Sequence, residues 1–296
     1  MNNTDLLNPN TYLNHLSPAD ARQYEICRNI CLITLGATIW DILVYIPDDI
    51  HIVKRGPFRF TIFSFIFSRV FAVGYALISV LQRTIPTSNP NTLTIVSSVL
   101  CVLAVGCSSF LFLQRVRAVY AGNRQAQWFF SIFWFIYATS EIVKIIGVKP
   151  SLIPGTHYFS DAGYQPYVAV GVFVGLLYDT CVFLAISYKI ILTHNMSDRH
   201  PGLRGLVHRF TSGKALPGLS HAVLQGGQQY YLITAGAMSA IGIIFVLPSV
   251  DQMIMAMVSA PLIPLIASMA CRVFRNLKSY DLNTPRMDIM SPVQFV

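Results

Sequence analysis

Long apolar runs separated by short polar segments dominate the chain. A helix needs about 20 residues to cross the roughly 30 Å hydrocarbon core of a bilayer. Seven runs reach this length, over residues 27–47, 58–82, 93–114, 125–147, 166–190, 223–248 and 251–274. The pattern predicts an all-α membrane protein with a seven-helix transmembrane domain over 27–279, a polar N-terminal segment over 1–26 and a tail over 280–296.

The composition supports a membrane rather than a soluble setting. Hydrophobic residues make up 54% of the chain and charged residues 11%, against about 25% charged in soluble domains. The net charge of +8 could indicate nucleic-acid binding, but the 21 Lys and Arg are scattered through the segments between apolar runs. Such scattering is typical of loop charge at a membrane, so the lipid bilayer is the expected partner and nucleic acid is not.

The distribution of positive charge predicts the orientation. Fifteen Lys and Arg fall on one side of the predicted bundle and four on the other, with Arg69 and Lys144 inside spans. The positive-inside rule places the fifteen in the cytoplasm, so the N-terminus is outside or lumenal and the C-terminus is cytoplasmic. The first 25 residues lack the apolar core of a cleaved signal, and Asn2 begins a glycosylation sequon. The pattern fits the plasma membrane and the endoplasmic reticulum equally.

Five charged residues fall inside the predicted spans, where charge is costly and therefore informative. Glu141 and Lys144 are three residues apart on one helical face and can form an ion pair. Arg69 needs a partner at its depth, and either Asp41 or Asp179 could supply one. Each pairing fits a structural clamp or part of an intramembrane polar pocket that binds a ligand.

Three tyrosines, Tyr75, Tyr137 and Tyr178, could join that polar pocket or simply pack with one satisfied hydroxyl. The histidines lie in the predicted loops and the N-terminal segment, and the six cysteines lie in apolar runs without a CxxC pair. Neither a metal site nor a bound cofactor is therefore expected.

Missing residues argue against several classes of seven-helix protein. Residues 251–271 contain no Lys for a retinal Schiff base, and no His lies inside the bundle for a zinc hydrolase. The second outer loop, over about 148–165, has no Cys, and the seventh span has no NPxxY motif. The topology is receptor-like without the motifs of rhodopsin-like receptors.

Several short motifs resemble a large family of uncharacterised seven-helix membrane proteins that is expanded in mushroom-forming fungi. They are Trp40-Asp41, Asp48-Asp49, Arg69, Gly227-Gln228-Gln229-Tyr230 and Arg272-Val273-Phe274-Arg275-Asn276. The chain departs from that family where it has Val53-Lys54-Arg55-Gly56 and Arg69-Val70. The resemblance implies the seven-helix topology and a fungal origin, and it brings no activity with it.

Three functions fit these observations. The first is a receptor-like sensor that takes a small or lipidic ligand from outside and meets a cytoplasmic signalling partner through its basic inner segments. The second is a membrane-embedded enzyme such as a terpene cyclase, in which a buried acid protonates a prenylated substrate. Asp179 is the better catalytic candidate, because Lys144 would keep Glu141 ionised. The third is a non-catalytic scaffold, for which the sequence gives no positive sign.

Overall fold

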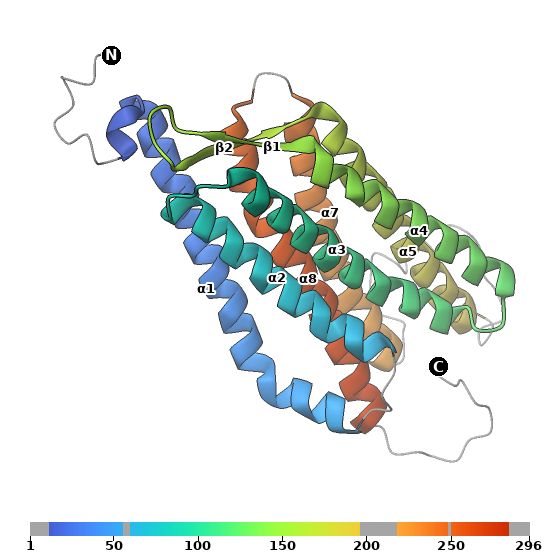
Figure 1. Ribbon diagram of the computed structural model, residues 1–296. Helices are drawn as coiled ribbons and strands as arrows, with labels where there is room; N and C mark the ends of the chain where they lie inside the picture. Colours follow the sequence, from blue (N-terminus) through green and yellow to red (C-terminus); the bar gives the residue numbers. More distant parts are fainter. Residues whose placement is uncertain (1–11, 56–59, 196–217, 248–249, 284–296) are drawn as a thin grey trace.

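The computed structural model describes residues 12–55, 60–195, 218–247 and 250–283, and it is mostly helical (Figure 1). Two short 3-10 helices, η2 (Tyr12–His15) and η3 (Pro166–Val168), accompany a two-stranded sheet of β1 (Val148–Leu152) and β2 (Phe159–Tyr164). The long helices are α1 (Pro18–Arg55), α2 (Phe60–Thr84), α3 (Pro90–Val119), α4 (Arg124–Gly147), α5 (Ala169–Asn195), α7 (Gly218–Val246) and α8 (Gln252–Asn283). The predicted sequon at Asn2 and the tail beyond residue 283 lie outside the described residues.

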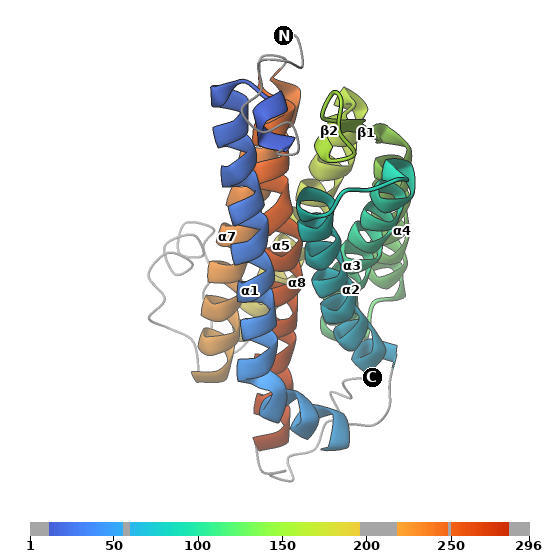
Figure 2. The same cartoon turned by 60° about the vertical axis from the view of Figure 1, so that its left-hand side comes forward.

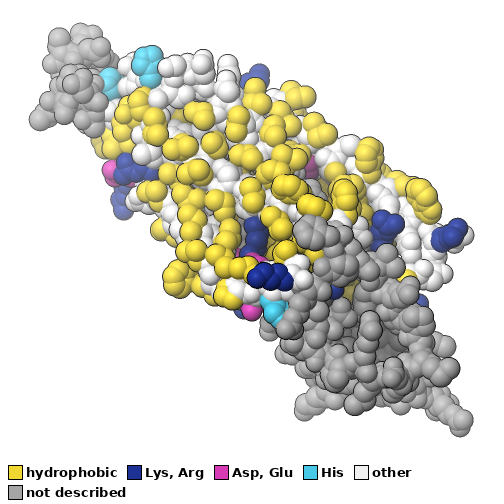
Figure 3. All heavy atoms as spheres, turned by 60° about the horizontal axis from the view of Figure 1, so that its bottom comes forward, with side chains coloured by type: hydrophobic (Ala, Val, Ile, Leu, Met, Phe, Trp, Pro, Cys, Tyr) yellow, Lys and Arg dark blue, Asp and Glu magenta, His cyan; other side chains and the backbone are white. Residues whose placement is uncertain are grey.

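The helices have the length and surface of membrane spans. Among the described residues, six helices (α1 to α5 and α8) are long and apolar enough to cross a bilayer, and α7 has a shorter apolar stretch at Ile233–Val246. Large apolar side chains such as Phe60 and Ile146 are more than 70% exposed, and yellow apolar side chains spread over the flank seen in Figure 3. So much exposed apolar surface requires a lipid environment. The chain is a multi-pass integral membrane protein.

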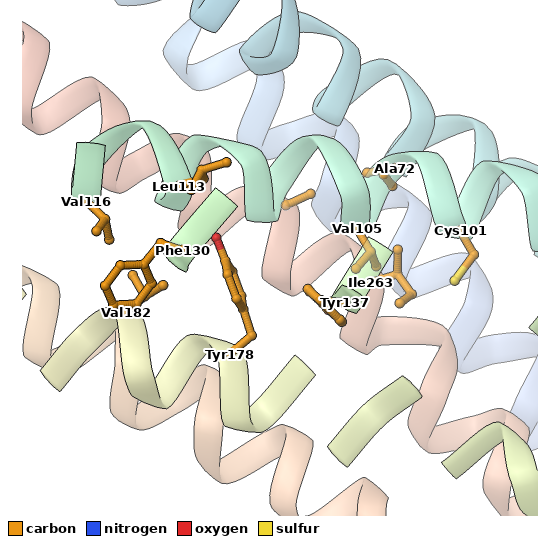
Figure 4. Packing of buried hydrophobic residues seen from close by; sticks show 12 residues of the cluster. Ala72, Cys101, Val105, Leu113, Val116, Phe130, Tyr137, Tyr178, Val182 and Ile263 are labelled. Carbon is orange, nitrogen blue, oxygen red and sulfur yellow. The ribbon is translucent and has the colours of Figure 1, made fainter. Parts of the chain in front are cut away.

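The bundle is built around α8, which packs against α1, α2, α3 and α7, while α4 and α5 pack beside α3. The helices run side by side along the long axis of the molecule (Figure 2). A core cluster joins α3, α4 and α5 (Figure 4), where the Tyr137 and Tyr178 rings stack with their centroids 5.4 Å apart. The Tyr178 hydroxyl also donates to the carbonyl of Ser109, 3.3 Å away. Both tyrosines are therefore packed in the hydrophobic core.

The first helix is longer than its apolar run. It begins at Pro18, where the Ser17 hydroxyl accepts a hydrogen bond from the Asp20 amide at 3.2 Å, and it continues to Arg55. Pro47 lies inside the helix, and the last turns of α1 bend away from the rest (Figure 1). A proline removes one helical hydrogen bond and crowds the preceding turn, which produces such bends.

The predicted outer loop over 148–165 contains an antiparallel hairpin. It covers the same end of the bundle as η2 (Figure 1) and packs on α3 and α8. Gly155, with φ of 78°, provides the left-handed residue of the connection. Tyr158 stacks on Tyr12 with ring centroids 4.1 Å apart, and the Thr87 amide donates to the His157 carbonyl at 2.8 Å. These contacts fasten the hairpin to the N-terminal segment and to the segment after α2.

Two glycines of α5 allow close approach to α4. A Cβ added at Gly175 would lie 2.7 Å from the Tyr137 ring, and one at Gly171 would lie 2.8 Å from Glu141 Oε1. Both distances are shorter than a carbon atom tolerates. The small residues therefore set the separation between these two helices.

We expect Gly175→Ala to lower the free energy of unfolding by about 1–3 kcal/mol, because the added methyl overpacks the contact with Tyr137. Gly36→Ala on α1 is the matched control, since its Cβ would meet nothing within 4 Å. That variant should be neutral or stabilising by up to about 1 kcal/mol, because alanine favours the helix. Thermal unfolding in detergent measures both, and equal effects would contradict the close-packing explanation.

Candidate functional site

A cavity lies between the helices at the end of the bundle that the hairpin covers. One side is polar and comes from α2 and α3. On α2 the lining residues Tyr75, Ser79, Gln82 and Arg83 recur at the spacing of one helical face. The α3 residues repeat this spacing, with Thr94, Ser97, Ser98 and Cys101 in line.

The opposite side of the cavity is mainly apolar. The hairpin and η3 contribute Val148, Phe159 and Val168 at the outer end. The remaining residues come from α5, α7 and α8, and they are Val172, Ile241, Phe245, Ala256, Ser259, Ala260, Leu262 and Ile263. The space not filled by atoms is about 820 Å³, including its open part. The cavity thus has two walls that one ligand can contact. We call the α2 and α3 residues of the lining the polar wall, and the α5, α7 and α8 residues the apolar wall.

Three polar side chains of this cavity form no hydrogen bond with the residues that the structure describes. Gln82, Ser97 and Ser98 are 5%, 9% and 7% exposed, and no hydrogen bond joins their side chains to another described residue. Other hydroxyls in the lining are satisfied locally, as Ser79 and Thr94 donate to carbonyls one turn back at 2.8 and 3.0 Å. Buried polar groups are nearly always hydrogen-bonded, so water or a ligand in the cavity has to meet these three.

Two cationic side chains also line the cavity. Arg83 is buried, and it donates through Nε to Cys27 Sγ and through Nη1 to the Ser79 carbonyl, both at 3.1 Å. Lys144 comes from α4, and its ammonium binds Glu141 Oε2 at 2.5 Å. The predicted Glu141–Lys144 ion pair is therefore confirmed, and its lysine faces the cavity.

The two carboxylates predicted as catalytic candidates are not part of the described cavity lining. Glu141 is 1% exposed, and its Oε1 has no hydrogen-bond partner and lies against α5 at Gly171. Asp179 lies within electrostatic reach of Glu141 and Tyr137. Neither acid is among the described residues that line the cavity.

Arg69 lies in a separate ion-pair cluster where α1, α2 and α8 meet. Its guanidinium binds Asp49 through Nη1, and its Nη2 is 3.7 Å from Asp41 Oδ2. Arg275 of α8 binds the other oxygen of Asp49 at 3.2 Å and lies over the Tyr45 ring at 3.6 Å. Asp49 therefore bridges two buried arginines. The predicted pairing with Asp41 is confirmed, whereas Asp179 is not a partner of Arg69.

The single polar pocket expected from the sequence is thus divided. Tyr75 and Lys144 line the cavity, and Asp41 and Arg69 belong to the ion-pair cluster. Tyr137 and Tyr178 lie in the hydrophobic core (Figure 4). Within the described part of the chain, no three His, Cys, Asp or Glu side chains come close enough to hold a metal ion.

Sequence reasoning missed the polar wall, although the chain carries a signal for it. The polar residues of the second span, Ser79, Gln82 and Arg83, fall on the same face as Tyr75, and Thr94, Ser97 and Ser98 do so on the third. Counting charges alone treats Arg83 as an outer loop residue and overlooks the uncharged groups beside it. Two polar faces on consecutive, antiparallel spans predict a shared polar surface.

We expect Ser98→Ala to leave the stability of the unliganded protein unchanged or raise it, because the hydroxyl has no partner to lose. Ser68→Ala is the matched control on the helix paired with it, since the buried Ser68 hydroxyl bonds Ser108 at 2.8 Å. That variant should cost about 1 kcal/mol. Thermal unfolding in detergent compares the two, and an equal loss in both would show that Ser98 is already satisfied.

Asp49→Asn should lower the stability by about 3–5 kcal/mol, because it leaves two buried guanidinium groups without their shared carboxylate. The neighbouring Asp48 is exposed and has no such role. Asp48→Asn should therefore change the stability by less than about 0.5 kcal/mol. Denaturation followed by circular dichroism distinguishes the variants, and a small effect at Asp49 would show that the cluster contributes little.

Comparison with known proteins does not extend this picture. No protein-family model matches the chain, and no curated protein matches it. The resemblance to the fungal seven-helix family therefore stays a prediction from the motifs quoted above.

Proposed function

We propose that the protein is a receptor-like membrane sensor that binds a small amphipathic ligand in the cavity between its polar α2–α3 wall and its apolar wall. The observation that carries the proposal is that Gln82, Ser97 and Ser98 line the cavity and form no hydrogen bond with another described residue. An occupant with a polar head and an apolar body satisfies these groups and covers the facing aliphatic side chains. Ligand sites commonly combine a largely apolar lining with a few such polar groups.

The charge pattern supports an orientation suited to sensing. The polar wall occupies the end of α2 near Arg83, whereas Arg115 and Arg117 lie at the far end of α3. By the positive-inside rule, the end with Arg115 and Arg117 is cytoplasmic and the cavity end is outer or lumenal. A ligand would then arrive from outside and leave the basic end to a cytoplasmic signalling partner.

The geometry favours binding over acid catalysis. A membrane-embedded cyclase needs a protonated carboxyl that reaches its substrate. Glu141 is held in an ion pair with Lys144, and neither Glu141 nor Asp179 is among the described lining residues. Acid catalysis by either residue would need a rearrangement that brings its carboxyl into the cavity.

The test compares farnesol with the hydrocarbon farnesene, using protein purified in lipid nanodiscs. Farnesol should raise the unfolding temperature of the unmodified protein, because a ligand that binds only the folded state stabilises it by about 2.7 kcal/mol at 100 times its Kd. Farnesene should stabilise it less, since it cannot hydrogen-bond the polar wall.

A triple variant with Gln82→Leu, Ser97→Ala and Ser98→Ala should lose most of the farnesol effect. The matched control is Ser64→Ala, a buried serine of α2 outside the described lining, which should retain it. If farnesene stabilises the protein as much as farnesol, and the triple variant behaves like the unmodified protein, the proposed use of the cavity is wrong.

A further inference from the structure

The polar wall also indicates the charge of the ligand. The two charged residues that line the cavity, Arg83 and Lys144, are both cationic, and no carboxylate lines the cavity among the residues that the structure describes. Charged groups inside a membrane protein mark functional sites by default. The positive charge of the lining therefore favours a ligand that carries a negative charge.

The uncharged groups of the wall can also bind an anion. The amide of Gln82 and the hydroxyls of Ser97 and Ser98 can all donate hydrogen bonds. All three residues are more than nine-tenths buried, and none of their side chains is hydrogen-bonded to another described residue. An ionised carboxylate accepts several hydrogen bonds through its two oxygens and donates none. Donors from two helices, joined by a guanidinium and an ammonium on the same cavity, match that chemistry.

The ammonium is held in place by a residue outside the cavity. Glu141 binds Lys144 at 2.5 Å from behind, with its other oxygen against α5. The Glu141 carboxylate thus fixes the direction of the Lys144 side chain without lining the cavity itself. Arg83 is likewise fixed, by Cys27 Sγ and the Ser79 carbonyl. Both cations are therefore oriented before a ligand arrives, which reduces the entropy lost on binding.

The apolar wall would contact the hydrocarbon part of the ligand. Val172 of α5, Ile241 and Phe245 of α7, and Ile263 of α8 face the polar helices across the cavity. These side chains cannot satisfy a polar group, and they gain free energy by covering hydrocarbon. A ligand that places its charged head at α2 and α3 directs its chain toward α5, α7 and α8.

We propose that the cavity selects an anionic amphiphile, namely a hydrocarbon chain that ends in a carboxylate, with Arg83 and Lys144 as the residues that recognise its charge. This inference rests on the proposed ligand-binding function and adds the chemical class of the ligand. It is tested with three compounds of equal chain length, dodecanoic acid, dodecanol and dodecylamine.

Binding is measured by stabilisation of the unmodified protein in nanodiscs at about pH 8.5, well above the ordinary pKa of a carboxyl group. Dodecanoic acid should bind on the order of 10- to 100-fold more tightly than dodecanol, the range expected for a hydrogen bond to a charged group. Dodecylamine should bind most weakly, since its ammonium meets two cations.

Variants then assign the preference to residues. Arg83→Gln, and separately Lys144→Gln combined with Glu141→Gln, should each reduce the preference for the acid over the alcohol by about tenfold. The combined change avoids leaving a buried carboxylate without its partner. Arg83→Lys should retain part of the preference. Arg28 lies near the start of α1 and is outside the described lining. Arg28→Gln should therefore leave the preference for the acid over the alcohol unchanged.

The outcomes separate the two proposals. Equal binding of acid and alcohol, or tighter binding of the amine, would overturn the anionic ligand. If that binding still disappeared in the Gln82, Ser97 and Ser98 triple variant, the amphipathic cavity would stand. Binding of all three compounds that is insensitive to the triple variant would instead overturn the proposed function itself. The headgroup series uses the unmodified protein, so it decides the question even if a variant fails to fold.

Discussion

A polar group inside an apolar bundle costs free energy unless it is hydrogen-bonded or paired, and this constraint organises the molecule. The structure meets it at two levels along the helices. At one level Asp49 joins Arg69 and Arg275, and at the other Glu141 holds Lys144. The core around Tyr137 and Tyr178 lies elsewhere in the bundle and packs without charge. The constraint is met only in part, since Nε and Nη2 of Arg69, Nη2 of Arg275 and Oε1 of Glu141 are buried without a hydrogen-bond partner in the described part of the chain. In the cavity lining, Gln82, Ser97 and Ser98 form no hydrogen bond with another described residue.

Much of the helical framework could be predicted from the sequence, because a lipid bilayer restricts which structures can span it. A bilayer demands long apolar helices, so the apolar runs over 58–82, 93–114 and 125–147 correspond closely to α2, α3 and α4. The Glu141–Lys144 pair was predictable for a similar reason, since a spacing of three residues places both on one helical face. Both features depend on local sequence alone.

The remaining features depend on contacts between distant segments. Asp49 was missed as a partner of Arg69 because the apolar run ends near Pro47, whereas the helix continues through a bend and carries Asp49 to α2 and α8. The hairpin was missed because Val148–Leu152 and Phe159–Tyr164 are short and rich in Pro, Gly and Ser, and their pairing is supported by α3 and α8. The pattern of apolar residues within one span predicts neither the contacts of Asp49 with α2 and α8 nor those of the hairpin with α3 and α8.

The cavity and the ion-pair cluster share two helices, because α2 and α8 take part in both. On α2, Gln82 lines the cavity and Arg69 joins the ion-pair cluster; on α8, Ser259 and Arg275 divide in the same way. A helix transmits displacement along its axis, so a ligand that moves α2 relative to α8 must also change the geometry around Asp49. The free energy available for such a change is limited to the difference in ligand affinity between the two arrangements. Breaking a buried ion pair costs several kcal/mol. The proposed ligand would therefore break the ion pairs of Asp49 only if its affinities for the two arrangements differed by that amount.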